Sequence, residues 1–326
     1  MATFSQRLAK YERQRSLPAD WSQKLAVFAA CFLAIVIVGH RFDTISTIPT
    51  FWLLGVGLAM VLAAIALGLR GLFDLWERGE EGGLKAARGL LLASLLIAPF
   101  FYTGLKAFTL PPLNDVSTDL DDPPQFENAV YDRTEAMNDI TDPTDVTRRL
   151  QLKAYPRVVA RRYPLGAGRV FSAVAELVRD RDWTILTSAT STGEAPIDDE
   201  GSALVAKPTS DANGLPLRVA TPNFRPPEIR DEPTTAIEAQ SVSPIGRNDA
   251  DSEEEPLEER YVEAVSSSLI FGFQTDVVFR IVEEEEGTLV DMRSASRWGP
   301  HDLGANAQQI ISFMEDLDTA LQGLSQ

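Results

Sequence analysis

"TDVVFRIVEEEEGTLVDMRSAS", residues 275–296, contains two runs of alternating apolar and polar residues on either side of an acidic turn. Alternation with a period of two predicts β-strands, and the short turn between the runs predicts an antiparallel hairpin. Pairing Val282 with Leu289 sets Arg280 opposite Asp291. A slip of one residue would move every side chain to the other face, so the apolar pattern specifies this register.

The two faces of the predicted hairpin differ in chemistry. One face is apolar and should pack on a core; it carries Val277, Phe279, Ile281, Val290 and Met292. The other face is charged; it carries Asp276, Arg280, Asp291 and Arg293. The simplest interpretation of Arg280 and Asp291 is a cross-strand ion pair, which contributes about 0.2–1 kcal/mol.

Elements on both sides of the hairpin complete an α+β domain. Residues 168–182 carry one apolar stripe at helical spacing, and residues 183–190 and 260–273 are typical of strands. A last helix follows Asp302, which is well placed as its N-cap. The order helix, strand, three strands, helix predicts an antiparallel sheet of about four strands covered on one face by two helices.

An insertion interrupts this domain at about 192–259. It is rich in Pro, Asp, Glu, Ser and Thr, and "NDADSEEEPLEE" within it has no apolar periodicity. Such a segment cannot bury enough apolar surface to offset the entropy of ordering it, so we expect it to be largely disordered.

Three apolar runs precede the domain. They are residues 25–39, 51–69 and 89–105, the last with Pro99 inside it. A helix needs about 20 apolar residues to cross a bilayer, and proline is tolerated in such helices. The sequence therefore predicts a three-helix transmembrane anchor over 25–106, before the α+β domain.

The distribution of Lys and Arg predicts the orientation of this anchor. Nine lie before the first run or between the second and third; they are Arg7, Lys10, Arg13, Arg15, Lys24, Arg70, Arg78, Lys85 and Arg88. Only Arg41 and Lys106 flank the other ends. By the positive-inside rule, residues 1–24 form a basic cytoplasmic N-terminus of a multi-pass protein of the bacterial inner membrane, and the domain at 151–326 is periplasmic.

The segment after the third run is acidic. We assign 107–150 to an acidic, proline-containing linker, which begins with "TLPPLNDVSTDLDDPPQF" at 109–126. The four Asp residues there do not follow the spacing of an EF-hand calcium loop. Two Pro-Pro pairs favour an extended chain, so we interpret the stretch as a spacer or a docking strap rather than a chemical site.

Composition argues against several function classes. The net charge is −17, and residues 107–326 carry 19 Lys and Arg against 40 Asp and Glu, which disfavours contact with nucleic acid. One cysteine, Cys31, allows no intramolecular disulfide and no cysteine zinc site. His40 and His301 are too far apart in sequence for a local metal motif, so we predict no metal and no cofactor.

Three stretches carry a resemblance to a known family. They are "LPPLNDVSTDLDDPPQF" (110–126), "FGFQTDVVFRIV" (271–282) and "DMRSASRWGPHDLGANAQQIISFM" (291–314). The chain resembles the membrane-bound members of domain-of-unknown-function family 1499. The resemblance implies an architecture and no activity; in the family pattern the strands flanking the insertion follow each other closely, so a long insertion departs from it.

One polar cluster could bind a ligand. "RSASRWGPHDLGAN" runs from a strand into a helix N-terminus, whose free N–H groups favour anions. The candidate binding residues are Arg293, Ser294, Ser296, Arg297, Asp302 and Asn306, with a carboxylate or phosphate as the ligand. In the alternative interpretation these residues cap the helix and pair with neighbouring groups, and so have a structural role.

Three functions stay open on the sequence. The first is a non-enzymatic membrane-anchored module that binds a partner protein or a small anionic ligand in the cell envelope. The second is a membrane-tethered hydrolase that uses Ser296 with His301, although no orienting acid and no Gly-x-Ser-x-Gly elbow are present. The third is a scaffold or assembly factor that acts through its transmembrane helices.

Overall fold

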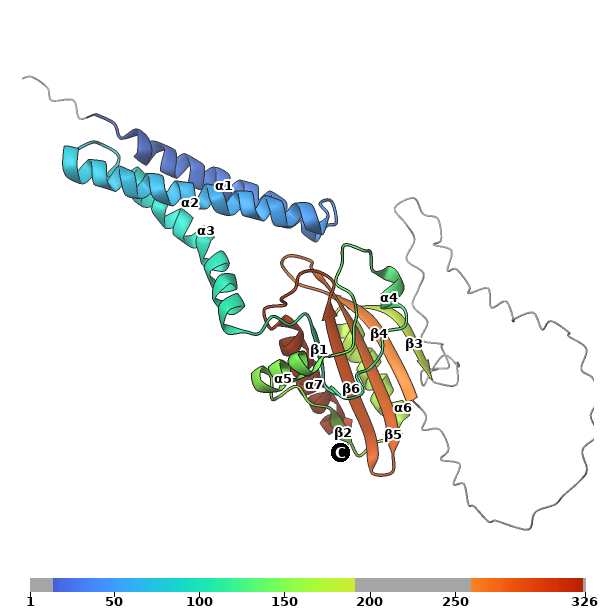
Figure 1. Ribbon diagram of the computed structural model, residues 1–326. Coiled ribbons are helices and arrows are strands. Elements are labelled where there is room, and N and C mark those ends of the chain that lie inside the picture. The colour runs from blue at the N-terminus through green and yellow to red at the C-terminus, as the bar shows by residue number, and fades with distance from the viewer. Residues whose placement is uncertain (1–13, 191–258, 325–326) are drawn as a thin grey trace, which may run out of the picture.

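The computed structural model describes residues 14–190 and 259–324. The predicted insertion at 192–259 lies, apart from Glu259, outside the described residues. The described chain has two parts, a bundle of three long helices and a sheet domain beside one end of it (Figure 1).

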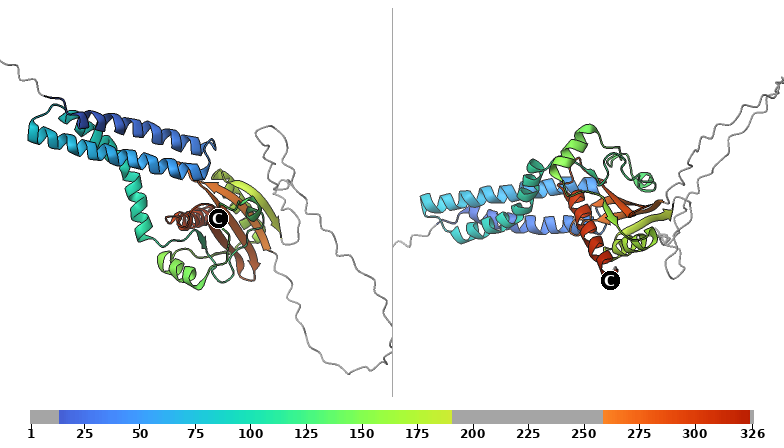
Figure 2. Two further views of the ribbon diagram at one scale, coloured as in Figure 1. Left: turned by 45° about the horizontal axis from the view of Figure 1, so that its top comes forward. Right: turned by 90° about the horizontal axis from the view of Figure 1, so that it is seen from below.

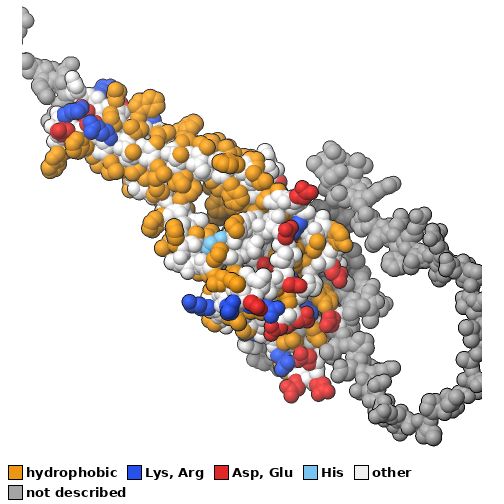
Figure 3. Space-filling view, viewed as in Figure 1, with side chains coloured by type: hydrophobic (Ala, Val, Ile, Leu, Met, Phe, Trp, Pro, Cys, Tyr) orange, Lys and Arg blue, Asp and Glu red, His pale blue; other side chains and the backbone are white. Residues whose placement is uncertain are grey.

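The three helices of the bundle contain the three predicted apolar runs. They are α1 (Leu17–Arg41), α2 (Thr47–Arg78) and α3 (Gly83–Thr109), and each is long and apolar enough to cross a membrane. Figure 3 shows apolar side chains along the middle of the bundle, with Lys and Arg gathered at the end away from the sheet domain.

Small residues let these helices approach closely. A Cβ added to Gly57 of α2 would lie 2.3 Å from a methyl group of Leu33 on α1, and one added to Gly89 of α3 would lie 2.4 Å from Ser22 Oγ. Ser22 in turn donates a hydrogen bond of 2.9 Å to the carbonyl of Ala64 on α2. Close packing and interhelical hydrogen bonds are what hold helices together in lipid, where the hydrophobic effect does not.

The third helix leaves the bundle part of the way along. Its buried residues, Ala86, Gly89 and Ala93, all precede Pro99. Proline removes a backbone hydrogen bond and clashes with the preceding turn, which bends a helix. After this point α3 diverges from α1 and α2 and leads towards the sheet domain (Figures 1 and 2).

The sheet has six antiparallel strands in the order β1-β6-β5-β4-β3, with β2 also paired to β6. The strands are β1 (Asp115–Ser117), β2 (Arg161–Tyr163), β3 (Thr184–Thr190), β4 (Glu259–Ser267), β5 (Gln274–Glu284) and β6 (Gly287–Ser296). The predicted hairpin is β5 and β6, and its register is confirmed, because Val282 pairs with Leu289 and Arg280 with Asp291.

Two helices cover one face of the sheet, as predicted. They are α6 (Ala167–Asp180) and α7 (Ala305–Leu324), and the core lies between them and the apolar face of the hairpin (Figure 2). The core includes Val170, Phe171, Val174, Val277, Phe279, Ile281, Val290, Met292, Ile310, Phe313 and Leu317. The predicted α+β class is therefore confirmed.

The segment assigned to a linker, 107–150, is largely part of the sheet domain. It contains β1, the short helix α4 (Ala129–Asp132) and the start of α5 (Asp145–Ala154), and β1 pairs with the edge of β6. The domain thus begins near Asp115 rather than at 151. Strands of three residues, such as β1 and β2, are too short to show a periodic pattern, so neither was predicted.

Removal of one aromatic ring from the core should destabilise the sheet domain. Phe279 is fully buried, with its ring 4.5 Å from that of Phe313. We expect Phe279→Ala to lower the free energy of unfolding of the sheet domain by about 3–5 kcal/mol, because the lost contacts leave a cavity. Guanidinium unfolding of the detergent-solubilised chain measures this change.

Tyr131→Ala is the matched control, because this aromatic side chain is 88% exposed. We expect it to change the free energy of unfolding by no more than about 0.5 kcal/mol. Similar losses in the two variants would contradict the assignment of the core.

Candidate functional site

The face of the sheet opposite α6 and α7 is charged and buried. Glu263, Asp276, Arg280, Asp291, Arg293 and Arg297 all lie on it, and each is less than one tenth exposed. Residues 110–141, which we call the strap, run from the end of α3 across these side chains. Charged groups are buried in proteins only when they are paired, so the partners that the strap supplies decide what this face can do.

Arg293 is the most deeply buried of these cations. Its side chain is fully buried and pairs with Asp115 of β1, with Nη2 2.8 Å from Oδ2 and Nε 3.1 Å from Oδ1. It also donates to the carbonyls of Pro124 (3.2 Å) and Thr141 (2.9 Å) and lies over the ring of Phe126. The strap therefore satisfies this guanidinium from several directions.

The predicted ion pair of Arg280 and Asp291 is present and is extended by the strap. Their closest atoms, Nη2 and Oδ2, are 3.2 Å apart, and Asp119 (3.3 Å) and Asp122 (2.5 Å) contact the same guanidinium. Thr118 donates to Asp291 at 2.9 Å. Burial raises the pKa of Asp291, against the opposing effects of Thr118 and Arg280.

Asp276 lies between two arginines. Its Oδ1 accepts from Arg297 Nη2 at 2.7 Å, and its Oδ2 accepts from Arg133 Nη2 of the strap at 2.7 Å. Arg133 also donates to the carbonyls of Asn138 and Ala295, at 2.6 and 3.0 Å. A fully buried carboxylate is thus compensated by one cation of the sheet and one of the strap.

Glu263 of β4 ties the middle of the strap to the sheet. Its carboxylate accepts from the backbone N–H groups of Asn128 (2.8 Å) and Ala129 (2.7 Å) at the start of α4. Burial raises the pKa of Glu263, and these backbone hydrogen bonds act in the opposite direction.

The opposite face of β6 carries the rest of the predicted cluster. Ser294 and Ser296 contact Asn306 Oδ1 at 3.3 and 3.1 Å, and Asn306 Nδ2 donates to the carbonyl of Asn114 at 2.8 Å. Asp302 accepts from the N–H groups of Gly304 and Asn306, at 2.8 and 2.9 Å. It caps the first turn of α7 from a position slightly before the helix, and burial raises its pKa.

These contacts hold the chain where it leaves α3. The N–H of Asp302 donates to the carbonyl of Leu113 at 2.8 Å, and that of Ser296 donates to Asn114, also at 2.8 Å. His301 contributes as well, with Nε2 3.2 Å from the carbonyl of Leu110 and Nδ1 accepting from the N–H of Leu303 at 3.0 Å. Both ring nitrogens of His301 are occupied, and no hydrogen bond joins it to Ser296 among the described residues.

The six predicted binding residues do not form one site. Alternation along β6 places Arg293 and Arg297 under the strap, whereas Ser294 and Ser296 face Asn306 on the other side. The two guanidiniums therefore do not join the helix N-terminus in one anion site. The binding role of these residues stays a prediction. The hydrogen bonds that they make in the structure are to other residues of the same chain.

Sequence reasoning missed the strap residues that complete this arrangement. Asp115, Asp119 and Arg133 contact the sheet face, yet the first two were interpreted as part of an acidic spacer or docking strap. One signal was available, since the hairpin register sets Asp291 opposite Arg280 but Val278 opposite Arg293, so Arg293 has no carboxylate across the strand. The acidic stretch 115–122 supplies the missing partners.

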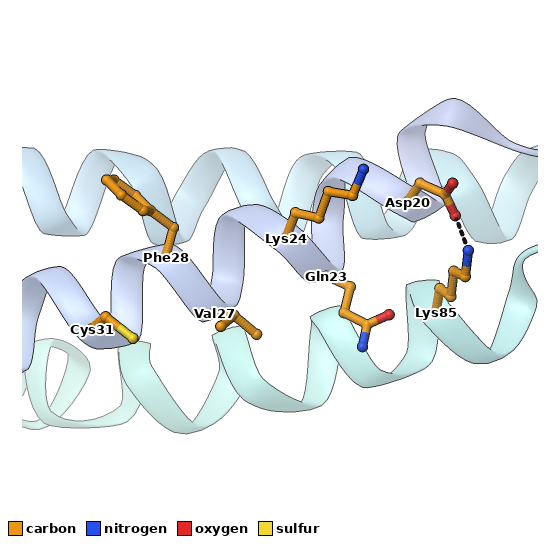
Figure 4. A pocket seen from close by; sticks show the side chains of 7 residues that line it. All are labelled: Asp20, Gln23, Lys24, Val27, Phe28, Cys31 and Lys85. Carbon is orange, nitrogen blue, oxygen red and sulfur yellow. Dashed lines mark hydrogen bonds and ion pairs between the residues drawn. The ribbon is translucent and has the colours of Figure 1, made fainter.

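A hollow of about 540 Å³ lies between α1 and α3, near the basic end of the bundle (Figure 4). Gln23, Lys24, Val27, Phe28 and Cys31 line it, and an ion pair of 2.7 Å between Lys85 and Asp20 closes one end. Across the described residues, no group of three His, Cys, Asp or Glu side chains could hold a metal ion.

Together these features define a class of protein, an α+β sheet domain attached to three apolar helices that are long enough to cross a membrane. Residues 115–317 match the family described as "Protein of unknown function (DUF1499)", and the chain belongs to this family. The resemblance stated from the sequence is therefore confirmed. A search of curated proteins finds no match, and a search of solved structures finds none either.

The buried pair of Arg293 and Asp115 leads to a stability prediction. We expect Arg293→Ala to lower the free energy of unfolding by about 3–5 kcal/mol, because the change removes a fully buried side chain and leaves the partly buried Asp115 without its cation. The measurement is guanidinium unfolding of the purified chain in detergent.

Arg157→Ala is the control, because Arg157 also pairs with a carboxylate, that of Glu315, but both side chains are at least half exposed. We expect this change to cost less than about 1 kcal/mol. An Arg293→Ala variant as stable as the parent, but inactive in cells, would instead support a ligand site at Arg293.

Proposed function

We propose that this protein is a non-enzymatic module anchored in the bacterial inner membrane, with its N-terminus in the cytoplasm and its sheet domain in the periplasm. The orientation is supported by the nine Lys and Arg at one set of helix ends against two at the other. Three crossings then leave the sheet domain on the side opposite the N-terminus.

One observation carries the non-enzymatic assignment: the polar groups that could do chemistry are bound by the chain itself. Asp115 and Asp276 occupy the guanidiniums of Arg293 and Arg297, and the Ser296 hydroxyl bonds to Asn306. Nucleophilic catalysis needs a base in contact with the serine, and His301 is engaged elsewhere. The geometry therefore favours binding to a partner over a hydrolase.

The strap offers a surface for a partner protein. Helix α4 exposes Val130 (49%) and Tyr131 (88%) beside a hollow of about 500 Å³, which Phe126, Glu127 and Asn128 also line. Exposed aromatic side chains beside a hollow are typical of the anchors of protein interfaces. We propose this patch as the contact for an envelope protein.

Reporter fusions test the orientation. We expect alkaline phosphatase fused after residue 130 to be active and the same enzyme fused after residue 80 to be inactive, because the enzyme folds only outside the cytoplasm. The measurement is phosphatase activity in cells, with the amount of each fusion checked by immunoblot. The reverse pattern would overturn the proposed topology.

Ser296→Ala tests the choice between binding module and hydrolase. We expect the variant to lose about 1 kcal/mol of stability, because one buried hydrogen bond disappears, and to complement a strain lacking the gene. Growth of the complemented strain and the thermal unfolding of the purified variant are the two measurements. A stable variant that fails to complement would support the hydrolase.

Tyr131→Ser distinguishes a partner surface on α4 from a scaffold that acts through its helices. We expect this variant to fold normally and to lose complementation. Tyr102→Ser is its matched control, because Tyr102 is also exposed (59%) but lies on α3. Loss of complementation in the control alone would favour the scaffold.

A further inference from the structure

The loop between β4 and β5 presents apolar side chains to its surroundings. Residues 268–273, "SLIFGF", which we call the tip loop, contain no charge, and Leu269 and Ile270 are 86% and 63% exposed. A turn on a soluble domain is usually polar, so two adjacent exposed aliphatic residues at a strand end need an explanation.

The tip loop touches the bundle where α1 ends and α2 begins. Arg41 Nε donates to the carbonyl of Leu269 at 3.2 Å, and His40 Nδ1 contacts the carbonyl of Phe271. Gly272 has a φ of +76° and lies against the backbone of Arg41. A Cβ added to Gly272 would lie 3.3 Å from the Cα of Arg41.

Aromatic rings continue this contact. The ring of Phe273 stacks on that of Phe51 at 5.3 Å and lies 4.9 Å from the ring of His40. Phe271 stacks on Phe273 in turn, at 5.7 Å. Offset stacking at these distances adds to the stability that burial alone provides.

These helix residues mark the level of the membrane surface. The apolar run of α1 ends at Gly39, directly before His40 and Arg41, and the apolar run of α2 begins at Phe51. A helix that crosses a bilayer places such boundaries at the interface between headgroups and acyl chains. The tip loop, which contacts both boundaries, lies at the same level.

The charge along the hairpin agrees with this placement. Strand β5 is eleven residues long; it begins beside the tip loop and ends in the acidic stretch Glu283–Glu286, of which Glu285 and Glu286 form the turn. At about 3.3 Å per residue, that turn is roughly 36 Å away along the strand. Figure 3 shows acidic side chains at the end of the domain farthest from the helices, where anionic lipids would not repel them.

We propose that the tip loop is a membrane-binding site, in which Leu269 and Ile270 insert into the boundary between lipid headgroups and acyl chains. The occupant is the bilayer leaflet on the side of the sheet domain. The inference rests on the proposed membrane anchoring, but not on which side of the membrane the domain occupies. The inserted tip loop gives the domain a second attachment to the membrane, besides the covalent one through α3.

Site-directed fluorescence tests the proposal, and the single native cysteine makes it simple. In a Cys31→Ser background, Leu269→Cys or Ile270→Cys is labelled with an environment-sensitive dye, and the full chain is reconstituted into vesicles of phosphatidylcholine and phosphatidylglycerol. Lipids that carry a nitroxide near the headgroup quench dyes at shallow depth. Both positions are exposed, so the substitutions leave the fold intact.

Glu285→Cys is the matched control, because this exposed residue lies in the turn at the other end of the hairpin. We expect the shallow nitroxide to quench dyes at 269 and 270 about threefold more than at 285, since interfacial side chains reach about 5–10 Å into the boundary. Iodide in the buffer should quench them less than at 285. Quenching at 269 and 270 that equals that at 285 would overturn the proposal.

The parent chain labelled at Cys31 separates the two possible failures. Cys31 lies exposed on α1, inside its apolar run, and nitroxides deep in the bilayer should quench it. If Cys31 is quenched but positions 269 and 270 are not, the anchoring holds and the tip loop proposal is wrong. If Cys31 is not quenched, the anchoring fails and the tip loop proposal fails with it.

Discussion

The pairing of buried charges on one face of the sheet is the constraint on which the rest of the structure depends. A guanidinium as deeply buried as that of Arg293 is tolerated only when a carboxylate and further acceptors surround it. The strap supplies these groups, from Asp115 at its start to Thr141 at its end. The strap must therefore lie on the sheet for the domain to fold, and it cannot act as a free spacer.

This constraint also fixes how the domain meets the helix bundle. The strap begins where α3 ends, so pairing Asp115 with Arg293 brings the end of α3 against β6. Hydrogen bonds of Asp302 and His301 to the carbonyls of Leu113 and Leu110 shorten the free chain further. With the contacts of the tip loop to His40 and Arg41, the domain is held to the bundle at two separate points.

The motifs behind the family resemblance are partners of one another. The first motif contributes Asn114, Asp115 and Thr118, and these contact the third motif through Asn306, Arg293 and Asp291, respectively. A chain that carries both motifs has the residues that hold the strap on the sheet. The resemblance therefore describes an architecture. The proposed partner surface on α4 lies between the first and second motifs, whereas the tip loop shares residues 271–273 with the second motif.

The sequence by itself determined the elements with long periodic patterns. Apolar runs predicted the three helices, and alternation over 275–296 predicted the β5–β6 register, because each pattern is local and repeats over many residues. The same alternation, applied strictly, would also have predicted that Arg293 and Ser294 lie on opposite faces of the sheet. Only the tertiary structure decided which carboxylate meets which guanidinium. Asp115 and Arg293 are 178 residues apart, and β1, which joins them, is three residues long, too short for any pattern to reveal.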